Sequence, residues 1–183
     1  MRALAITLTA PILDIRSGSE EASLDARPRP RVAIIAHDGK KADLVAFATY
    51  NRNRLQTCNL LATSHTGSLL EEKVGLSVER FPSGPLGGDV QVAAQVVDGE
   101  IDAVLFIVDP LGKHPHDPDI QTLLRICNVH DVPLATNIAT ADVLMGSEVL
   151  WEKARSRADA RLRRRVMARS EQGAAGEGTA NGS

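Results

Sequence analysis

The chain has 183 residues, of which 43% are hydrophobic and 24% are charged, as is usual for soluble globular proteins. This length suits one ordinary hydrophobic core and is short for two domains. The formal net charge of -2 argues against a dedicated nucleic-acid-binding protein, and the apolar runs are too short to span a membrane. Cys58 and Cys127 suggest neither a metal site nor a disulfide framework, so a reduced cytoplasmic setting is expected.

Short apolar stretches alternate with segments of helical periodicity after an N-terminal extension. Residues 1–30 end in Ser-, Glu- and Pro-rich sequence and are expected to be disordered. Periodicity and turn residues then predict the regular elements. Strands are expected at 31–37, 59–63, 77–81, 101–108 and 132–136. Five helices are expected between and after them: one that begins at about Lys40, one over 66–73, one over 90–97, one that ends at about His130 and one that begins near Thr140.

This alternation predicts βαβ units and an α/β fold, with a Rossmann-like, doubly wound parallel sheet of five strands in a single domain over residues 31–150. The strand at 77–81 is less apolar and suits an edge, and the strand at 101–108 is the most hydrophobic and suits the centre. Residues 151–170 hold eight Lys/Arg against two Asp/Glu, which predicts a basic, solvated helix. Residues 171–183 are expected to form a flexible tail.

Right-handed crossovers place every strand-to-helix loop at one edge of such a sheet, where ligands bind in open α/β folds. Four of the five histidines and much of the Gly, Ser, Thr and Asp content fall on these loops. Together they indicate an active site. The first loop carries His37, Asp38 and Lys41, the second Thr63, Ser64, His65 and Thr66, the third residues 83–89, the fourth Asp109, His114, His116, Asp117 and Asp119, and the fifth Thr136 and Asn137.

The third loop reads Ser-Gly-Pro-Leu-Gly-Gly-Asp at residues 83–89. Its glycines allow backbone N–H groups to approach an anion. Asp89 begins a helix, where the dipole favours its ionised form, so it could act as a general base beside a phosphate-sized cradle. The same residues also suit an ordinary turn with Asp89 as the N-cap.

The second loop offers hydroxyl and backbone N–H groups at a helix start, which is a suitable anion site, and Lys41 adds a positive charge. Neither a Gly-Lys-Ser/Thr nor a Gly-x-Gly-x-x-Gly pattern occurs, so a small phosphorylated molecule is indicated rather than a nucleotide cofactor. His114 and His116, with nearby aspartates, could ligate a metal, but further ligands are not evident. We favour His116 as a neutral hydrogen-bond donor, with Asp119 in its network.

Several of these motifs together resemble the methylglyoxal synthase family, over about residues 31–145. They are His-Asp-x-x-Lys at 37–41, the motif at 83–89, Asp-Pro-Leu at 109–111, Pro-His-Asp-Pro-Asp at 115–119 and Ala-Thr-Asn at 135–137. The resemblance implies a Rossmann-like domain in a homohexamer, with no metal or organic cofactor. It also implies a lyase that converts dihydroxyacetone phosphate to methylglyoxal and inorganic phosphate through an enediolate. Phosphate, the product, is then expected to inhibit as well.

The resemblance also implies roles for individual residues. Asp89 matches the catalytic base, and His37 and His116 match the histidines at the carbonyl and hydroxyl oxygens of the substrate. Asp119 matches an acidic residue of the surrounding site, as do Asp38 and Asp109. The phosphate cradle is matched by Lys41, Thr63, Ser64, His65, Thr66, Ser83 and Gly84.

Three features depart from the family pattern, and one of them is the unassigned extension at residues 1–30. Ser64 and His65 stand where the family usually has Gly and Thr or Ser. The family also uses a C-terminal arginine to bind phosphate, and here six compete for that role: Arg155, Arg157, Arg161, Arg163, Arg164 and Arg165. Two alternatives stay open, a non-catalytic regulatory module that binds a small phosphorylated metabolite and a basic-tailed nucleic-acid accessory protein. The 3% aromatic content disfavours the second.

Overall fold

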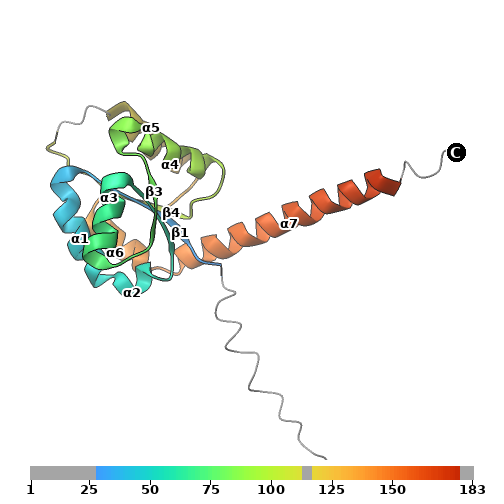
Figure 1. Ribbon diagram of the computed structural model, residues 1–183, viewed down its shortest axis with the longest axis horizontal. Helices are drawn as coiled ribbons and strands as arrows, with labels where there is room; N and C mark the ends of the chain where they lie inside the picture. The colour runs from blue at the N-terminus through green and yellow to red at the C-terminus, as the bar shows by residue number, and fades with distance from the viewer. Residues whose placement is uncertain (1–27, 113–116, 178–183) are drawn as a thin grey trace, which may run out of the picture.

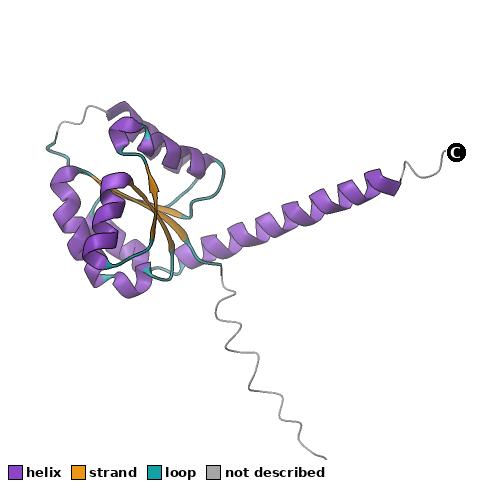
Figure 2. Cartoon of the chain, viewed as in Figure 1, coloured by secondary structure: helices purple, strands orange, loops and turns teal. Residues whose placement is uncertain are grey.

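Five short parallel strands form the centre of the molecule (Figure 1 and Figure 2). The computed structural model describes residues 28–112 and 117–177. The sheet order is β3-β2-β1-β4-β5, which confirms the expected five-stranded, Rossmann-like α/β fold. The strands are β1 (Arg31–Ala36), β2 (Asn59–Thr63), β3 (Val78–Phe81), β4 (Ala103–Ile107) and β5 (Leu134–Ala135).

Helices connect consecutive strands and cover both faces of the sheet. Between β1 and β2 lie η2 (Asp38–Lys40), α1 (Lys41–Tyr50) and α2 (Arg52–Leu55), and between β2 and β3 lie α3 (Ser64–Leu69) and η3 (Leu70–Val74). The later elements are η4 (Gly84–Leu86), α4 (Gly88–Val97), α5 (Asp117–Val129), α6 (Ile138–Gly146) and α7 (Val149–Glu177).

The two faces of the sheet are built from alternate residues of the same strands, as the two-residue period of a strand requires. Along β1, Val32 and Ile34 pack in one cluster with α1, η3 and α6, whereas Ala33 and Ile35 pack in the other with α4 and α5. Both clusters are buried, which explains the near-continuous hydrophobic runs of the central strands. The fold is therefore a three-layer sandwich with the sheet in the middle.

Strand order places β1 beside β4. Strands β2 and β3 are added on one side of β1, and β4 and β5 are added on the other side. Ala33 pairs with Val104 and Ile35 with Phe106 in this register. In doubly wound sheets the crevice beyond the carboxyl ends of such neighbouring strands is the usual ligand site. The weakly apolar strand β3 lies at the edge, as its composition predicts.

Some boundaries differ from the expectations. Helical backbone begins at Ser64 rather than Thr66, because Thr63 is still extended and the turn follows at once. β5 is only two residues long, and it follows Pro133, which has no N–H to donate. Pairing continues past it through one further hydrogen bond, from Val108 N to Thr136 O at 3.1 Å.

Helix α7 begins against the domain and extends away from it (Figure 1). Leu150 and Ala154 in its first turns are fully buried, whereas Leu162 and Met167 are exposed. It overruns both ends of the expected basic helix at 151–170 and enters the segment expected to be a tail, where alanines favour helix. The expected extension up to residue 27 and residues 178–183 lie outside the described residues. Among the described helices, none combines the length and apolar character needed to cross a bilayer.

Candidate active site

A cavity of about 450 Å³ opens at the carboxyl ends of β1, β2 and β3. The loops after these three strands supply its walls, as the shared edge of a parallel sheet requires. Eight of the eleven candidate site residues line it: His37, Lys41, Thr63, His65, Thr66, Ser83, Gly84 and Asp89. The cavity therefore gathers residues that are up to 52 positions apart in the chain (37 to 89).

His37 is held across the gap between β1 and β4. Its backbone N–H donates to Ile107 O at 3.2 Å, and its Nδ1 accepts from the backbone N–H of Asp109 at 2.9 Å. An Nδ1 that accepts a hydrogen bond carries no proton, so the neutral imidazole has its proton on Nε2. The ring also packs edge-on to Phe106, with centroids 5.0 Å apart. His37 is thus a fixed, neutral hydrogen-bond donor through Nε2.

Asp89 lies in the first turn of α4 and is fully buried, at 0% exposure, in the cavity wall. The preceding turn folds tightly on itself, with Ser83 O accepting from Gly88 N at 3.1 Å. A Cβ on Gly88 would come within 2.0 Å of the carbonyl oxygen of Pro82, so this position requires glycine. Gly87 has a φ of +86°, which also favours glycine. The loop therefore places a carboxylate at a helix N-terminus, where the dipole favours its charged form.

Two threonines, one at the end of β2 and one in the first turn of α3, form a buried hydroxyl pair in the same cavity. Thr63 Oγ1 and Thr66 Oγ1 are 3.3 Å apart, and both residues are buried. His65 is exposed at the cavity, whereas Ser64 is not among the lining residues. Ser64 is the first residue of α3, and its backbone carbonyl accepts from Ser68 Oγ at 3.2 Å within that helix.

Lys41 brings a positive charge to the cavity at the start of α1. Its ammonium group forms an ion pair with the carboxylate of Asp38. The hydrogen bond from Lys41, together with its charge, lowers the pKa of Asp38 below the ordinary value. Asp38 therefore stays ionised at neutral pH and pairs with Lys41, which lines the same cavity as the hydroxyl pair.

Asp109 acts on the site through its backbone. Its N–H orients His37, whereas its Oδ1 accepts from Leu111 N at 3.2 Å within its own turn. Gly39 was not singled out from the sequence, yet a Cβ there would lie 2.6 Å from Asp109 Oδ2. The signal that could have identified Gly39 is its place in the turn directly after a buried strand and His37.

The remaining candidates are not gathered in the cavity. Asp119 lies in the first turn of α5, is half-buried and is not among the lining residues. His116, the second candidate histidine, and His114 lie outside the described residues. Among the residues that the structure describes, no group of three His, Cys, Asp or Glu side chains could hold a metal ion.

One of the six competing arginines lies at the opposite edge of the sheet. Arg157 of α7 forms a two-point ion pair with the buried carboxylate of Asp102, with Nε–Oδ1 at 2.9 Å and Nη2–Oδ2 at 2.7 Å. Asp102 immediately precedes β4 and also accepts from Arg31 N at 2.7 Å. The Arg157 guanidinium is therefore paired with Asp102 and does not reach the cavity of its own chain.

Comparisons with known proteins point to one family. The MGS-like domain model matches residues 43–136. A methylglyoxal synthase from Ralstonia nicotianae is 54% identical over 117 residues, which is 64% of this chain and 87% of the relative. Another from Cupriavidus pinatubonensis is 56% identical, covering 64% of this chain and 90% of the relative.

A solved structure shows the same likeness in three dimensions. The crystal structure of methylglyoxal synthase from Elizabethkingia anophelis superposes with a TM-score of 0.64 and 41% identity, over 67% of this chain and 81% of that one. The region matched by the family model contains the glycine turn, Asp89, Thr63 and Thr66, all of which contribute to the cavity wall. Sequence, fold and cavity agree, and the chain belongs to the methylglyoxal synthase family.

Proposed function

We propose that this protein is a methylglyoxal synthase, a lyase that converts dihydroxyacetone phosphate to methylglyoxal and inorganic phosphate. The observation that carries the proposal is the cavity at the carboxyl edge of the sheet. The fully buried carboxylate of Asp89 lines this cavity together with the neutral donor His37 and the hydroxyl pair of Thr63 and Thr66. Relatives that carry the name methylglyoxal synthase support the same activity.

The first chemical step is a proton transfer to Asp89. Its carboxylate removes a proton from the hydroxymethyl carbon beside the substrate carbonyl, and the electron pair moves to form an enediolate. His37 donates through Nε2–H to the oxygen on which negative charge develops, and stabilises it as the charge grows. His116 is proposed as the second donor and Asp119 as part of the surrounding acidic network.

The second step releases phosphate. The hydroxyl group on the deprotonated carbon loses its proton and becomes the aldehyde carbonyl. The carbon–carbon double bond shifts toward the phosphate-bearing carbon as the carbon–oxygen bond to phosphate breaks, and the enol product then tautomerises to methylglyoxal. The ester bond must stand out of the enediolate plane for this overlap. We propose that the cradle of Lys41, Thr63, Thr66, Ser83 and Gly84 holds the phosphate in that orientation, with His65 at its rim; Ser64 does not line the cavity and is not part of this proposal. Free phosphate binds the same cradle and therefore inhibits.

The test of the reaction is direct. Purified protein is incubated with dihydroxyacetone phosphate, and methylglyoxal and free phosphate are both measured; equal molar amounts of the two are expected. Asp89→Asn should lower kcat by about 10²–10⁴-fold, the usual contribution of a general base, and still bind the planar enediolate mimic phosphoglycolohydroxamate. The matched control is Asp43→Asn, which removes an exposed carboxylate paired with Lys40.

Two outcomes would count against the proposal. A loss below about tenfold in Asp89→Asn would place the base elsewhere. Binding of the mimic by the wild type with no product would instead identify a regulatory module. We also propose a homohexamer, a number of subunits that rests on the family resemblance. Helix α7, which extends away from its own domain, offers a surface for contacts between subunits. Light scattering that gives a monomer mass at micromolar concentration would refute the assembly.

A further inference from the structure

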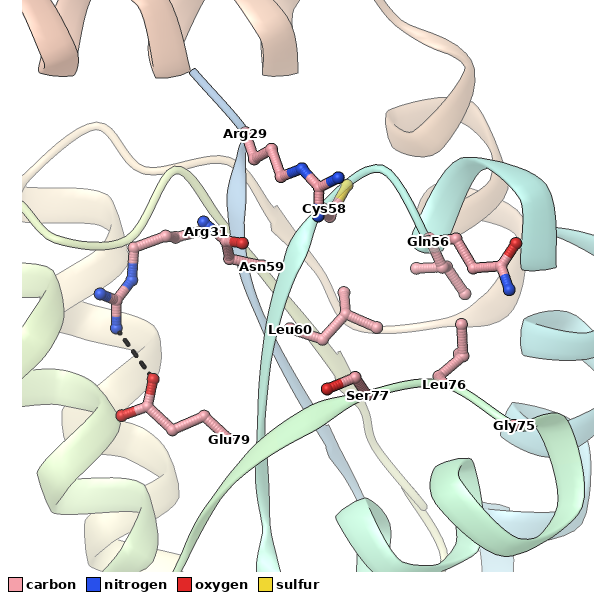
Figure 3. A pocket seen from close by; sticks show the side chains of 11 residues that line it. Arg29, Arg31, Gln56, Cys58, Asn59, Leu60, Gly75, Leu76, Ser77 and Glu79 are labelled. Atoms are coloured by element: carbon pink, nitrogen blue, oxygen red, sulfur yellow. Dashed lines mark hydrogen bonds and ion pairs between the residues drawn. The ribbon is translucent and has the colours of Figure 1, made fainter. Parts of the chain in front are cut away.

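A second cavity lies at the amino ends of β1, β2 and β3, at the opposite edge of the sheet from the candidate active site (Figure 3). Its volume is about 550 Å³, which is within the range of small-molecule sites. Arg29 and Arg31, just before and at the start of β1, stand on one side, and Ser77 stands on the other. This cavity has no part in the proposed reaction.

The cavity is rich in hydrogen-bond donors. Arg31 Nε is buried and has no hydrogen-bond partner among the described residues, and Arg31 Nη2 contacts Glu79 at 3.4 Å. In its better amide orientation Gln56 accepts from the Arg52 guanidinium at 3.0 Å, so its oxygen is already paired. Asn59, exposed at the start of β2, adds a further amide.

The charge balance of the lining is positive. Arg29 and Arg31 carry two positive charges, and Glu79 is the single carboxylate among the lining residues, already paired with Arg31. An adjoining hollow of about 430 Å³ shares Arg29, Arg31 and Asn59 and extends to Arg157. Guanidinium groups present donors in a rigid fork that matches the oxygens of phosphate.

We propose that this cavity is a second anion site, which binds the phosphate group of a small phosphorylated molecule between Arg29, Arg31 and Asn59. It is physically linked to the candidate active site, because β2 runs from Asn59 in one cavity to Thr63 in the other. The proposal does not depend on the reaction proposed above, since it concerns binding alone.

The test counts phosphate ions bound to the full-length protein. Equilibrium dialysis with inorganic phosphate should give two per chain in the wild type, one in each cavity. Arg29→Gln should weaken one of them by at least about tenfold, as expected for loss of a charged donor, and leave turnover unchanged. Asn59→Asp, which places a carboxylate at the same site with almost no change in shape, should abolish the same binding event. Arg163→Gln, an exposed arginine of α7, is the matched control and should retain both.

A separate variant distinguishes the two sites. Thr66→Val removes a buried hydroxyl of the active-site cradle and should weaken the other event, leaving the Arg29-dependent one intact. One phosphate per chain in the wild type would overturn the proposal. Two phosphate ions bound per chain in both Arg29→Gln and Asn59→Asp, with affinities unchanged from the wild type, would overturn it as well.

Discussion

The ion pair between Arg157 and Asp102 should anchor α7 to the domain, and its removal should be costly. Asp102 is 3% exposed and accepts three hydrogen bonds, two from Arg157 at 2.9 and 2.7 Å and one from Arg31 N at 2.7 Å. Arg157→Ala leaves the carboxylate buried with one partner. Breaking a buried pair in this way typically costs about 3–5 kcal/mol. Because 13% of the Arg157 side chain is exposed and water can enter, about 3 kcal/mol is expected.

The assay is urea unfolding at one fixed protein concentration, since any assembly would make stability depend on concentration. In a parallel thermal unfolding experiment, the same loss of about 3 kcal/mol would lower Tm by roughly 6–12 °C for a chain of this size. Arg157→Lys keeps the charge but loses the two-point geometry, so about half of the loss is expected. The exposed Arg163→Ala on the same helix is the control and should change the free energy of unfolding by less than about 0.5 kcal/mol.

A double-mutant cycle with Asp102→Ala isolates the pair. Replacing both partners removes the buried charge together with its counter-ion, so the double variant should be less unstable than the sum of the single changes. A coupling free energy of about 2 kcal/mol or more is expected. A coupling below about 1 kcal/mol, the range of exposed ion pairs, would refute the reasoning and place the anchor of α7 in its buried leucine and alanine instead.

Three further predictions concern the cavity wall and the buried thiols. Gly88→Ala should lower kcat by about 10²-fold, because the new Cβ would meet a carbonyl oxygen at 2.0 Å and displace the turn before the base. The control is Gly146→Ala at the end of α6, where the nearest atom to a new Cβ is 3.9 Å away, and it should retain activity. His65→Thr should change KM several-fold with kcat nearly unchanged if the imidazole contacts phosphate, and an unchanged KM would show that it does not. Burial raises the pKa of Cys58 and of Cys127 to about 11, so both thiols should react with an aromatic disulfide reagent at pH 8 only on unfolding, and fast reaction of the native protein would contradict their burial.

Much of the fold could be predicted because its signals are local. Apolar runs of four to eight residues alternate with helical periodicity, and this pattern by itself implies a parallel sheet covered on both faces. The right-handedness of crossovers then places all strand-to-helix loops at one edge, whatever the strand order. For this reason His37, the hydroxyls after β2 and Asp89 could be assigned to one site before their geometry was known.

Boundaries were less predictable, because a few hydrogen bonds decide them. The register of the turn after Thr63 determines that Thr66 faces the cavity and Ser64 does not, and periodicity cannot resolve a shift of two residues. Asp119 was assigned from its motif, but its place in α5 leaves it outside the cavity lining. A motif specifies residue types, whereas the direction of a helix decides where their side chains lie.

The sequence by itself determined the α/β class, the edge at which the site lies and the residue types found there. Only the tertiary structure decided that β1 lies beside β4, so that the backbone of Asp109 reaches His37 from 72 positions away and sets its tautomer. It likewise decided that Arg157 pairs with Asp102, which no local pattern indicates among six similar arginines. The physical reason is that local periodicity reports which face of an element is buried. The choice of partner between distant residues depends on packing and on charges that meet only after the strands have assembled.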